Sequence, residues 1–171
     1  MAERSSETKA RAWLDRLEIR DLVDRYSDAV TRCDWRQCEP LFAPDATWES
    51  PRLGLRFEGC AAFMEFLTAT SAYDLLIQTP HSSVITLTDD DRAEATTTVH
   101  ELARGVGLAD TEFGAGGAAV NVEQYGVYYD RFARIDGEWK FIRRVFEPIY
   151  ADVHSVNGDV LTQRSAMLRP D

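Results

Sequence analysis

The sequence predicts an α+β domain in which a curved, mostly antiparallel sheet wraps around a long N-terminal helix. Three observations support this prediction. Helical periodicity fills the first 33 residues, strand-like runs fill most of the second half, and Asp136 and Gly137 form a turn signal between two β-rich runs. Helices followed by a block of antiparallel strands are typical of α+β domains. At 171 residues with no internal repeat, one core is expected.

The first helix is expected to start at a Ser6 cap and to run to about Cys33. Its apolar residues recur at steps of three and four, so they form one stripe that must face a core. The stripe consists of Ile19, Leu22, Val23, Tyr26, Val30 and Cys33. Asp34 opens a D-W-R-Q pattern with Gln37 three residues on, which predicts a capping box and a second short helix that stops before Pro44.

The middle of the chain should add a small strand pair and a helix. The run Ala46–Ser50 reads as a strand, and the Gly-containing segment after it indicates a second short strand. From Cys60 to Tyr73 the spacing of Phe63, Phe66 and Leu67 predicts a helix with one face on that sheet.

A strand pattern starts at Leu76 and continues to the end of the domain. Strict alternation would place His81, Ser83, Ile85 and Leu87 on one face, and the acidic run at 89–91 indicates a turn. The next strand is expected from Ala93 to Gly105. Residues 107–121 are rich in Gly and Ala, which favours a loop, either a lid or an ordinary surface insertion.

The last two strands should form a hairpin with a two-residue type I′ turn at Asp136-Gly137. This turn sets a register that pairs Arg134 with Trp139, Phe132 with Phe141, Asp130 with Arg143 and Tyr129 with Arg144. Neighbouring residues on a strand face opposite ways. We therefore expect an ion pair between Arg143 and Asp130, and Arg144 pointing into the interior.

The charge and composition exclude several classes of partner. A net charge of -10 disfavours nucleic acid and anionic membranes, and no apolar run approaches the ~20 residues that span a bilayer. The N-terminus carries charges of both signs and has no apolar signal stretch, so a cytoplasmic location is expected. Three cysteines and three histidines without ligand spacing predict reduced, structural thiols and no metal site.

Three stretches of the sequence follow one another in a characteristic order. They are YSDAVTRCDWRQCEPLFAPDATW, TPHSSVITL and YYDRFARIDGEWKF. Together they resemble the SnoaL-like branch of the nuclear-transport-factor-2-like superfamily, whose members include scytalone dehydratase, bile-acid 7α-dehydratase and hexachlorocyclohexane dehydrochlorinase. The resemblance implies a cone-shaped α+β barrel. It divides the chain into a SnoaL-like domain at 17–150, an extension of the first helix at 1–16 and a C-terminal tail at 151–171.

The resemblance also implies a catalytic pair. In the eliminating relatives a strand His is the general base, and a carboxylate near the end of the first helix orients it. His81 takes the place of that base. One alignment matches the carboxylate to Asp34, while another puts Thr31 where many relatives carry Asp. Thr31 cannot hold a negative charge, so under the second alignment the pair is broken.

Four further residues are site candidates. Tyr26 and Arg144 match pocket positions of the relatives and could stabilise negative charge. Trp48 could wall the pocket, and His100 could add a polar group. Each candidate also has a structural interpretation, namely a core aromatic, a buried His or, for Asp34, a helix cap.

Two hypotheses about function follow. The first is an enzyme without cofactors that abstracts a proton from a small, mostly apolar, cyclic or polyketide-like molecule, leading to dehydration, isomerisation or cyclisation. The second is a binding or assembly module without catalysis, which the residue Thr31 favours. The partner in either case is a small molecule, and a homodimer or homotrimer is expected.

Overall fold

The structure, a computed structural model, describes residues 2–69, 73–106 and 119–161. Its helices and strands follow the order helix, helix, two strands, helix and four strands that the sequence predicts. They are α1 (Ala2–Arg32), α2 (Trp35–Cys38), the 3-10 turn η1 (Glu39–Leu41), β1 (Phe42–Ser50), η2 (Pro51–Leu53), β2 (Leu55–Glu58), α3 (Cys60–Ala69), β3 (Tyr73–Leu87), β4 (Arg92–Val106), β5 (Ala119–Ile135) and β6 (Glu138–Ser155).

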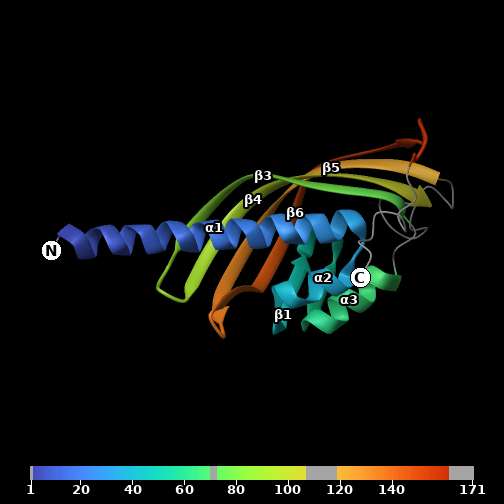
Figure 1. Cartoon of the computed structure of the whole chain (residues 1–171). Helices are drawn as coiled ribbons and strands as arrows, with labels where there is room; N and C mark the ends of the chain where they lie inside the picture. Colours follow the sequence, from blue (N-terminus) through green and yellow to red (C-terminus); the bar gives the residue numbers. More distant parts are fainter. Residues whose placement is uncertain (1, 70–72, 107–118, 162–171) are drawn as a thin grey trace.

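The six strands form one curved sheet in the order β2-β1-β6-β5-β4-β3, and this sheet does not close into a barrel. Every neighbouring pair is antiparallel except β1 and β6, which are parallel. The long strands arch over α1, α2 contacts α1 near its C-terminal end, and α3 packs against β1 and β2 (Figure 1). We call the side of the sheet that faces α1 the interior face and the opposite side the outer face. The predicted fold class is confirmed.

Helix α1 begins at Ala2, four residues before the expected Ser6 cap. Residues 3–10 include Glu, Lys, Arg and Ala, which are good helix formers, so the helix can begin before Ser6. The predicted apolar stripe is buried from Ile19 to Val30, with Ile19 and Val23 fully enclosed, while Cys33 at its end is partly exposed. The helix ends where Cys33 adopts a left-handed φ of 53°. No helix in the described part of the chain is long and apolar enough to cross a membrane.

Asp34 precedes α2 as predicted, but it does not use the predicted capping box. Its side chain makes no hydrogen bond to the backbone of α2. Instead, Gln37 Nε2 donates to Asp34 Oδ2 at 2.8 Å. The backbone of Asp34 carries out the capping, because its carbonyl accepts hydrogen bonds from the amides of Gln37 and Cys38.

The hairpin between β5 and β6 has the predicted turn, since Asp136 and Gly137 both have positive φ, 51° and 85°. Arg134 opposes Trp139 and Phe132 opposes Phe141, as expected. Beyond that point the prediction is wrong, because a bulge lies between Arg131 and Phe132 and shifts the register. Arg143 therefore opposes Arg131, and Arg144 opposes Asp130.

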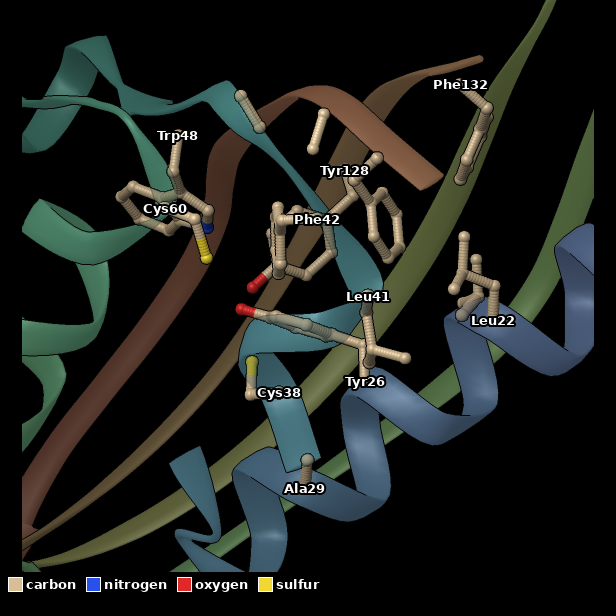
Figure 2. Close-up of a cluster of buried hydrophobic side chains, with 14 of the residues drawn as sticks. Leu22, Tyr26, Ala29, Cys38, Leu41, Phe42, Trp48, Cys60, Tyr128 and Phe132 are labelled. Carbon is tan, nitrogen blue, oxygen red and sulfur yellow. The ribbon is translucent and has the colours of Figure 1, made fainter. Parts of the chain in front are cut away.

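The core lies between α1, α3 and the interior face. Figure 2 shows part of it, where Tyr26 of α1 lies beside Phe42 and the ring of Trp48 lies beside Cys60. Phe42 stacks on Phe141 with ring centroids 5.0 Å apart. Of the Gly- and Ala-rich segment at 107–121, residues 107–118 lie outside the described part of the chain, and 119–121 form the start of β5 rather than a loop.

Candidate active site on the interior face

An ion pair lies at the centre of the interior face. Arg144 of β6 and Asp130 of β5 are direct cross-strand partners, and Arg144 Nε lies 3.3 Å from Asp130 Oδ1. Both side chains are almost fully buried. Arg144 faces the interior as expected, although its partner is Asp130 and not Tyr129. Arg143, on the outer side, pairs with Glu49 at 3.1 Å instead of with Asp130.

Aromatic rings enclose the Arg144 guanidinium. Its central carbon lies 4.0 Å from the ring centroid of Tyr26, 3.7 Å from that of Tyr128 and 4.5 Å from that of Phe141. Cations stack favourably on aromatic faces, and more so where water is excluded. The stacking holds the guanidinium in one place and puts a positive charge next to two phenol groups.

The pKa values of these groups reflect opposing effects. Burial raises the pKa of Asp130 from 3.8 to about 7, against the lowering effect of Arg144. Burial also raises the pKa of Tyr128 to about 12, and raises that of Tyr26 well above 10, while Arg144 lowers both. The two hydroxyl groups also affect each other, and their interaction raises the pKa of Tyr26 and lowers that of Tyr128.

A second polar group on the interior face is centred on Glu101 of β4. Gln78 Nε2 donates to Glu101 Oε2 at 2.9 Å, and Gln124 Nε2 donates to Glu101 Oε1 at 2.6 Å. Gln78 Nε2 also lies 3.4 Å from the Tyr128 hydroxyl, which links this group to Tyr26 and Tyr128 beside Arg144. The carboxyl of Glu101 is thus fixed by one amide from each neighbouring strand.

Glu101 is the acidic residue at the centre of this group. Burial raises its pKa, and the amides of Gln78 and Gln124 and the nearby His100 oppose this effect. The residue as a whole is partly buried. A carboxyl whose pKa is raised by burial is the kind of group that enzymes use as a general base.

Helix α1 positions Gln78 in this group. Ser27 Oγ donates to Gln78 Oε1 at 3.3 Å, and Thr31 Oγ1 accepts from the backbone N–H of Gln78 at 2.9 Å. Thr31 therefore contacts the backbone of β3. One of the two alignments expected a carboxylate at this position, and the hydroxyl of Thr31 instead anchors Gln78.

His81 is not where alternation placed it. A bulge between Pro80 and Ser83 inserts an extra residue, so Ser83 faces the interior while His81 is exposed. Its ring lies 6.3 Å from that of His100 and 6.5 Å from that of Tyr125, both on the outer face. The expectation that His81 shares a face with Ser83, Ile85 and Leu87 is wrong for this reason.

The other predicted partners of a His base also lie elsewhere. The buried carboxylate of Asp34 contacts Gln37 and, at 3.9 Å, Arg36, so it is not paired with His81. His100 stacks on Tyr125 with centroids 4.4 Å apart and lies 3.0 Å from Glu123. The outer face thus carries a row of rings. The expected homodimer or homotrimer, which could cover this row, stays a prediction.

A half-open hollow of about 570 Å³ lies outside, between α1 and α2, and it is lined by Asp24, Arg25, Asp28, Arg36, Gln37 and Pro40. Its two aspartates already pair with Arg20 and Arg32 at 2.9 Å, so it offers little free charge. Within the described ranges no three His, Cys, Asp or Glu residues come together in a way that could hold a metal ion.

Sequence reasoning missed Glu101, Gln78, Tyr128 and the interior role of Asp130. The alternation of faces in β4 could have indicated Glu101. Ala95, Thr97 and Val99 are buried, and Glu101 continues this series of every second residue on the same face. Gln78 and Tyr128 carried no signal of their own, since their importance comes from meeting Glu101.

The sequence matches the family described as SnoaL-like domain over residues 11–145, which is most of the chain. The chain belongs to the SnoaL-like family. No curated protein matches it. The match fits the geometry above, because a curved, mostly antiparallel sheet wrapped around a long N-terminal helix is the arrangement that the sequence predicted.

Solved structures share this fold at low sequence identity. A type 2 hexachlorocyclohexane dehydrochlorinase superposes with a TM-score of 0.76 at 16% identity, covering 89% of this chain and 97% of that one. A type 3 dehydrochlorinase from Novosphingobium barchaimii gives 0.76 at 16%, covering 90% and 99%. A protein provisionally assigned as a scytalone dehydratase, from Novosphingobium aromaticivorans, gives 0.72 at 17%, covering 87% and 93%. These similarities establish the fold of this SnoaL-like protein.

Proposed function

We propose that this SnoaL-like protein is an enzyme of the lyase or isomerase type that needs no cofactor and moves a proton on a small, mostly apolar molecule held against the interior face. The observation that carries the proposal is the Glu101 carboxyl, which two side-chain amides hold on the interior face and whose pKa burial raises. The structures named as dehydrochlorinase and scytalone dehydratase add support at the level of the family.

Glu101 is the general base in this proposal. A carboxylate takes a proton from carbon best when its pKa is raised toward the working pH, and burial acts on Glu101 in that direction. Gln78 and Gln124 aim both oxygens and prevent rotation of the carboxyl. Fixed geometry of this kind is a large part of what an enzyme contributes to a proton transfer.

The negative charge that develops on the substrate needs a counterpart. The side-chain amide of Gln78 contacts both Glu101 and the hydroxyl of Tyr128. The ring of Tyr128 lies against the guanidinium of Arg144. The rings of Tyr26 and Tyr128 contact each other edge to face and both lie against Arg144, so the three residues form one unit that favours negative charge. Tyr26 and Arg144 keep the role that the resemblance assigned to them, and Tyr128 joins them.

The test does not need the natural substrate. Cyclic and aromatic ketones would be incubated with the protein in D₂O, and exchange of the hydrogens next to the carbonyl would be followed by NMR. We expect exchange with the unmodified protein and a loss on the order of 100-fold or more in Glu101→Gln, the usual size of a general-base contribution. His81→Gln should exchange normally. Glu123→Gln is the matched control, because Glu123 pairs with His100 on the outer face.

The outcomes separate the hypotheses. Exchange that survives in Glu101→Gln but is lost in His81→Gln would restore His81 as the base and overturn the proposal. Ketones that bind without any exchange would favour the second candidate, a ligand-binding module without catalysis. That candidate is supported by Thr31, which binds the β3 backbone at the position where one of the two alignments expects a carboxylate.

A further inference from the structure

Three large apolar side chains lie exposed on α1. Trp13, Leu14 and Leu17 are 66%, 52% and 62% exposed. Residues three and four apart on a helix are neighbours on its surface, so these three side chains form one patch. We call Trp13, Leu14 and Leu17 the helix patch. Contiguous apolar patches on a protein surface usually mark interaction sites.

The helix patch points away from the body of the protein. On the opposite side of α1, Asp15 is buried beside Arg134 and Ile19 lies in the core. The N-terminal end of α1 also extends beyond the sheet (Figure 1). The described part of the chain therefore leaves this side of the helix open to a partner.

A charged residue lies at each end of the row that contains the patch. Lys9, Trp13, Leu17 and Asp21 follow one another at steps of four, and such residues form a ridge along a helix. Lys9 and Asp21 are exposed, and neither forms an ion pair with a described residue. The ridge is thus basic at one end, apolar in the middle and acidic at the other end.

This ridge is complementary to a second copy of itself. When two copies lie antiparallel about a two-fold axis midway between Trp13 and Leu17, Lys9 faces the partner's Asp21 and Trp13 faces the partner's Leu17. Every contact then occurs twice, as in other two-fold interfaces. Packing of two ridges with steps of four is also the commonest way in which helices pack. A parallel arrangement would place like charges together.

We infer that the helix patch is a contact between two copies of this chain, in which the two α1 helices pack antiparallel and Lys9 pairs with the partner's Asp21. The contact lies on the side of α1 that faces away from the interior face of the sheet. The inference therefore goes beyond the proposed function and does not depend on it.

The experiment measures self-association by sedimentation equilibrium. One helix from each copy makes a small interface, and small interfaces are typical of weak association, so protein concentrations from about 10 to 500 μM are needed. Salt at about 0.1 M screens the repulsion between two copies of net charge -10. The mean molar mass should rise with concentration from 19.3 kDa toward that of a dimer.

Leu17→Asp should weaken the association at least about tenfold, because it brings two carboxylates into the apolar centre of the contact. Val84→Asp is the matched control, since Val84 is 70% exposed on β3, away from α1. It makes the same kind of change and should leave the association unaltered. Both positions are exposed, so both variants should fold, which circular dichroism would verify.

A charge exchange tests the antiparallel arrangement directly. Lys9→Glu and Asp21→Lys each replace two attractive contacts by two repulsive ones, so each variant alone should associate about tenfold more weakly. An equimolar mixture of the two variants should associate about as tightly as the unmodified protein. In the mixed dimer each of the two charged contacts again joins opposite charges.

A protein that stays monomeric up to about 500 μM would overturn the inference. So would association that survives Leu17→Asp but is lost in Val84→Asp, because the contact would then lie on the sheet. A mixture of Lys9→Glu and Asp21→Lys that associates as weakly as either variant alone would refute the pairing of Lys9 with the partner's Asp21.

Discussion

Arg144 and Asp130 oppose each other on neighbouring strands, with 3.3 Å between Nε and Oδ1, deep beneath α1. Such a pair is enclosed because three aromatic rings surround the guanidinium and exclude water. Buried ion pairs contribute little net stability relative to apolar residues, but removing one partner is costly. The pair therefore makes the interior of this protein sensitive both to substitution and to pH.

The first prediction concerns the pH dependence of stability. The pKa of Asp130 is about 7 in the folded protein, against 3.8 for an aspartate in an unfolded chain, so between these values the folded state holds a proton that the unfolded state has lost. The stabilisation that protonated Asp130 contributes is fully present below pH 3.8. The free energy of unfolding then falls as the pH rises from about 4 to about 7. Asp130→Asn lacks this contribution.

Urea unfolding at a series of pH values, followed by circular dichroism, would measure this effect. The stability of the unmodified protein minus that of Asp130→Asn should decrease with rising pH across the window. A difference that increases with pH would mean that Arg144 keeps the carboxylate ionised throughout, against the effect of burial.

The second prediction concerns the contact between α1 and the hairpin. Arg134 donates to Asp15, which is 5% exposed, and its guanidinium stacks on Trp139 at 4.4 Å. Arg134→Met should lower the free energy of unfolding by about 2 kcal/mol, because the buried carboxylate keeps only its exposed partner Arg11. The Arg131–Glu94 pair, exposed on both sides, is the matched control. Arg131→Met should cost less than about 1 kcal/mol, and equal costs would contradict the distinction.

The third prediction concerns Gly126 on β5. A Cβ at this position would lie 2.7 Å from Phe146 Cζ and 2.9 Å from the carbonyl oxygen of Glu147. Gly126→Ala should destabilise the protein by about 1–3 kcal/mol, since the ring of Phe146 must move away from Tyr128. Phe146→Leu combined with Gly126→Ala should recover part of the loss in thermal unfolding, relative to the sum of the single variants. Strict additivity would show that the backbone contact alone is responsible.

The fourth prediction concerns the thiols, which the sequence suggested are structural. Burial raises the pKa of Cys38 to about 12 and that of Cys60 to about 11, so almost no thiolate forms at either residue near pH 8. Cys33 is partly exposed. Mass spectrometry after brief treatment with iodoacetamide should find Cys33 modified first, and all three residues modified after unfolding in urea. Early modification of Cys38 in the folded protein would contradict its burial.

The sequence by itself determined the features that depend on local chemistry. The type I′ turn follows from Asp136-Gly137, because these residues tolerate positive φ. The stripe that includes Ile19 and Tyr26 specified the buried side of α1, since helical spacing fixes which residues share a face. The order of elements and the family followed from the same local patterns.

Only the tertiary structure decided which side chains meet inside the molecule. One extra residue at each of two bulges reverses the period-two alternation of a strand, so His81 faces outward and Arg144 meets Asp130 instead of Tyr129. Glu101 contacts Gln78 and Gln124 because β3, β4 and β5, which curve over α1, pair in a register that places these three residues side by side. Bulges and curvature arise from packing between distant segments, and no single stretch of sequence carries that information.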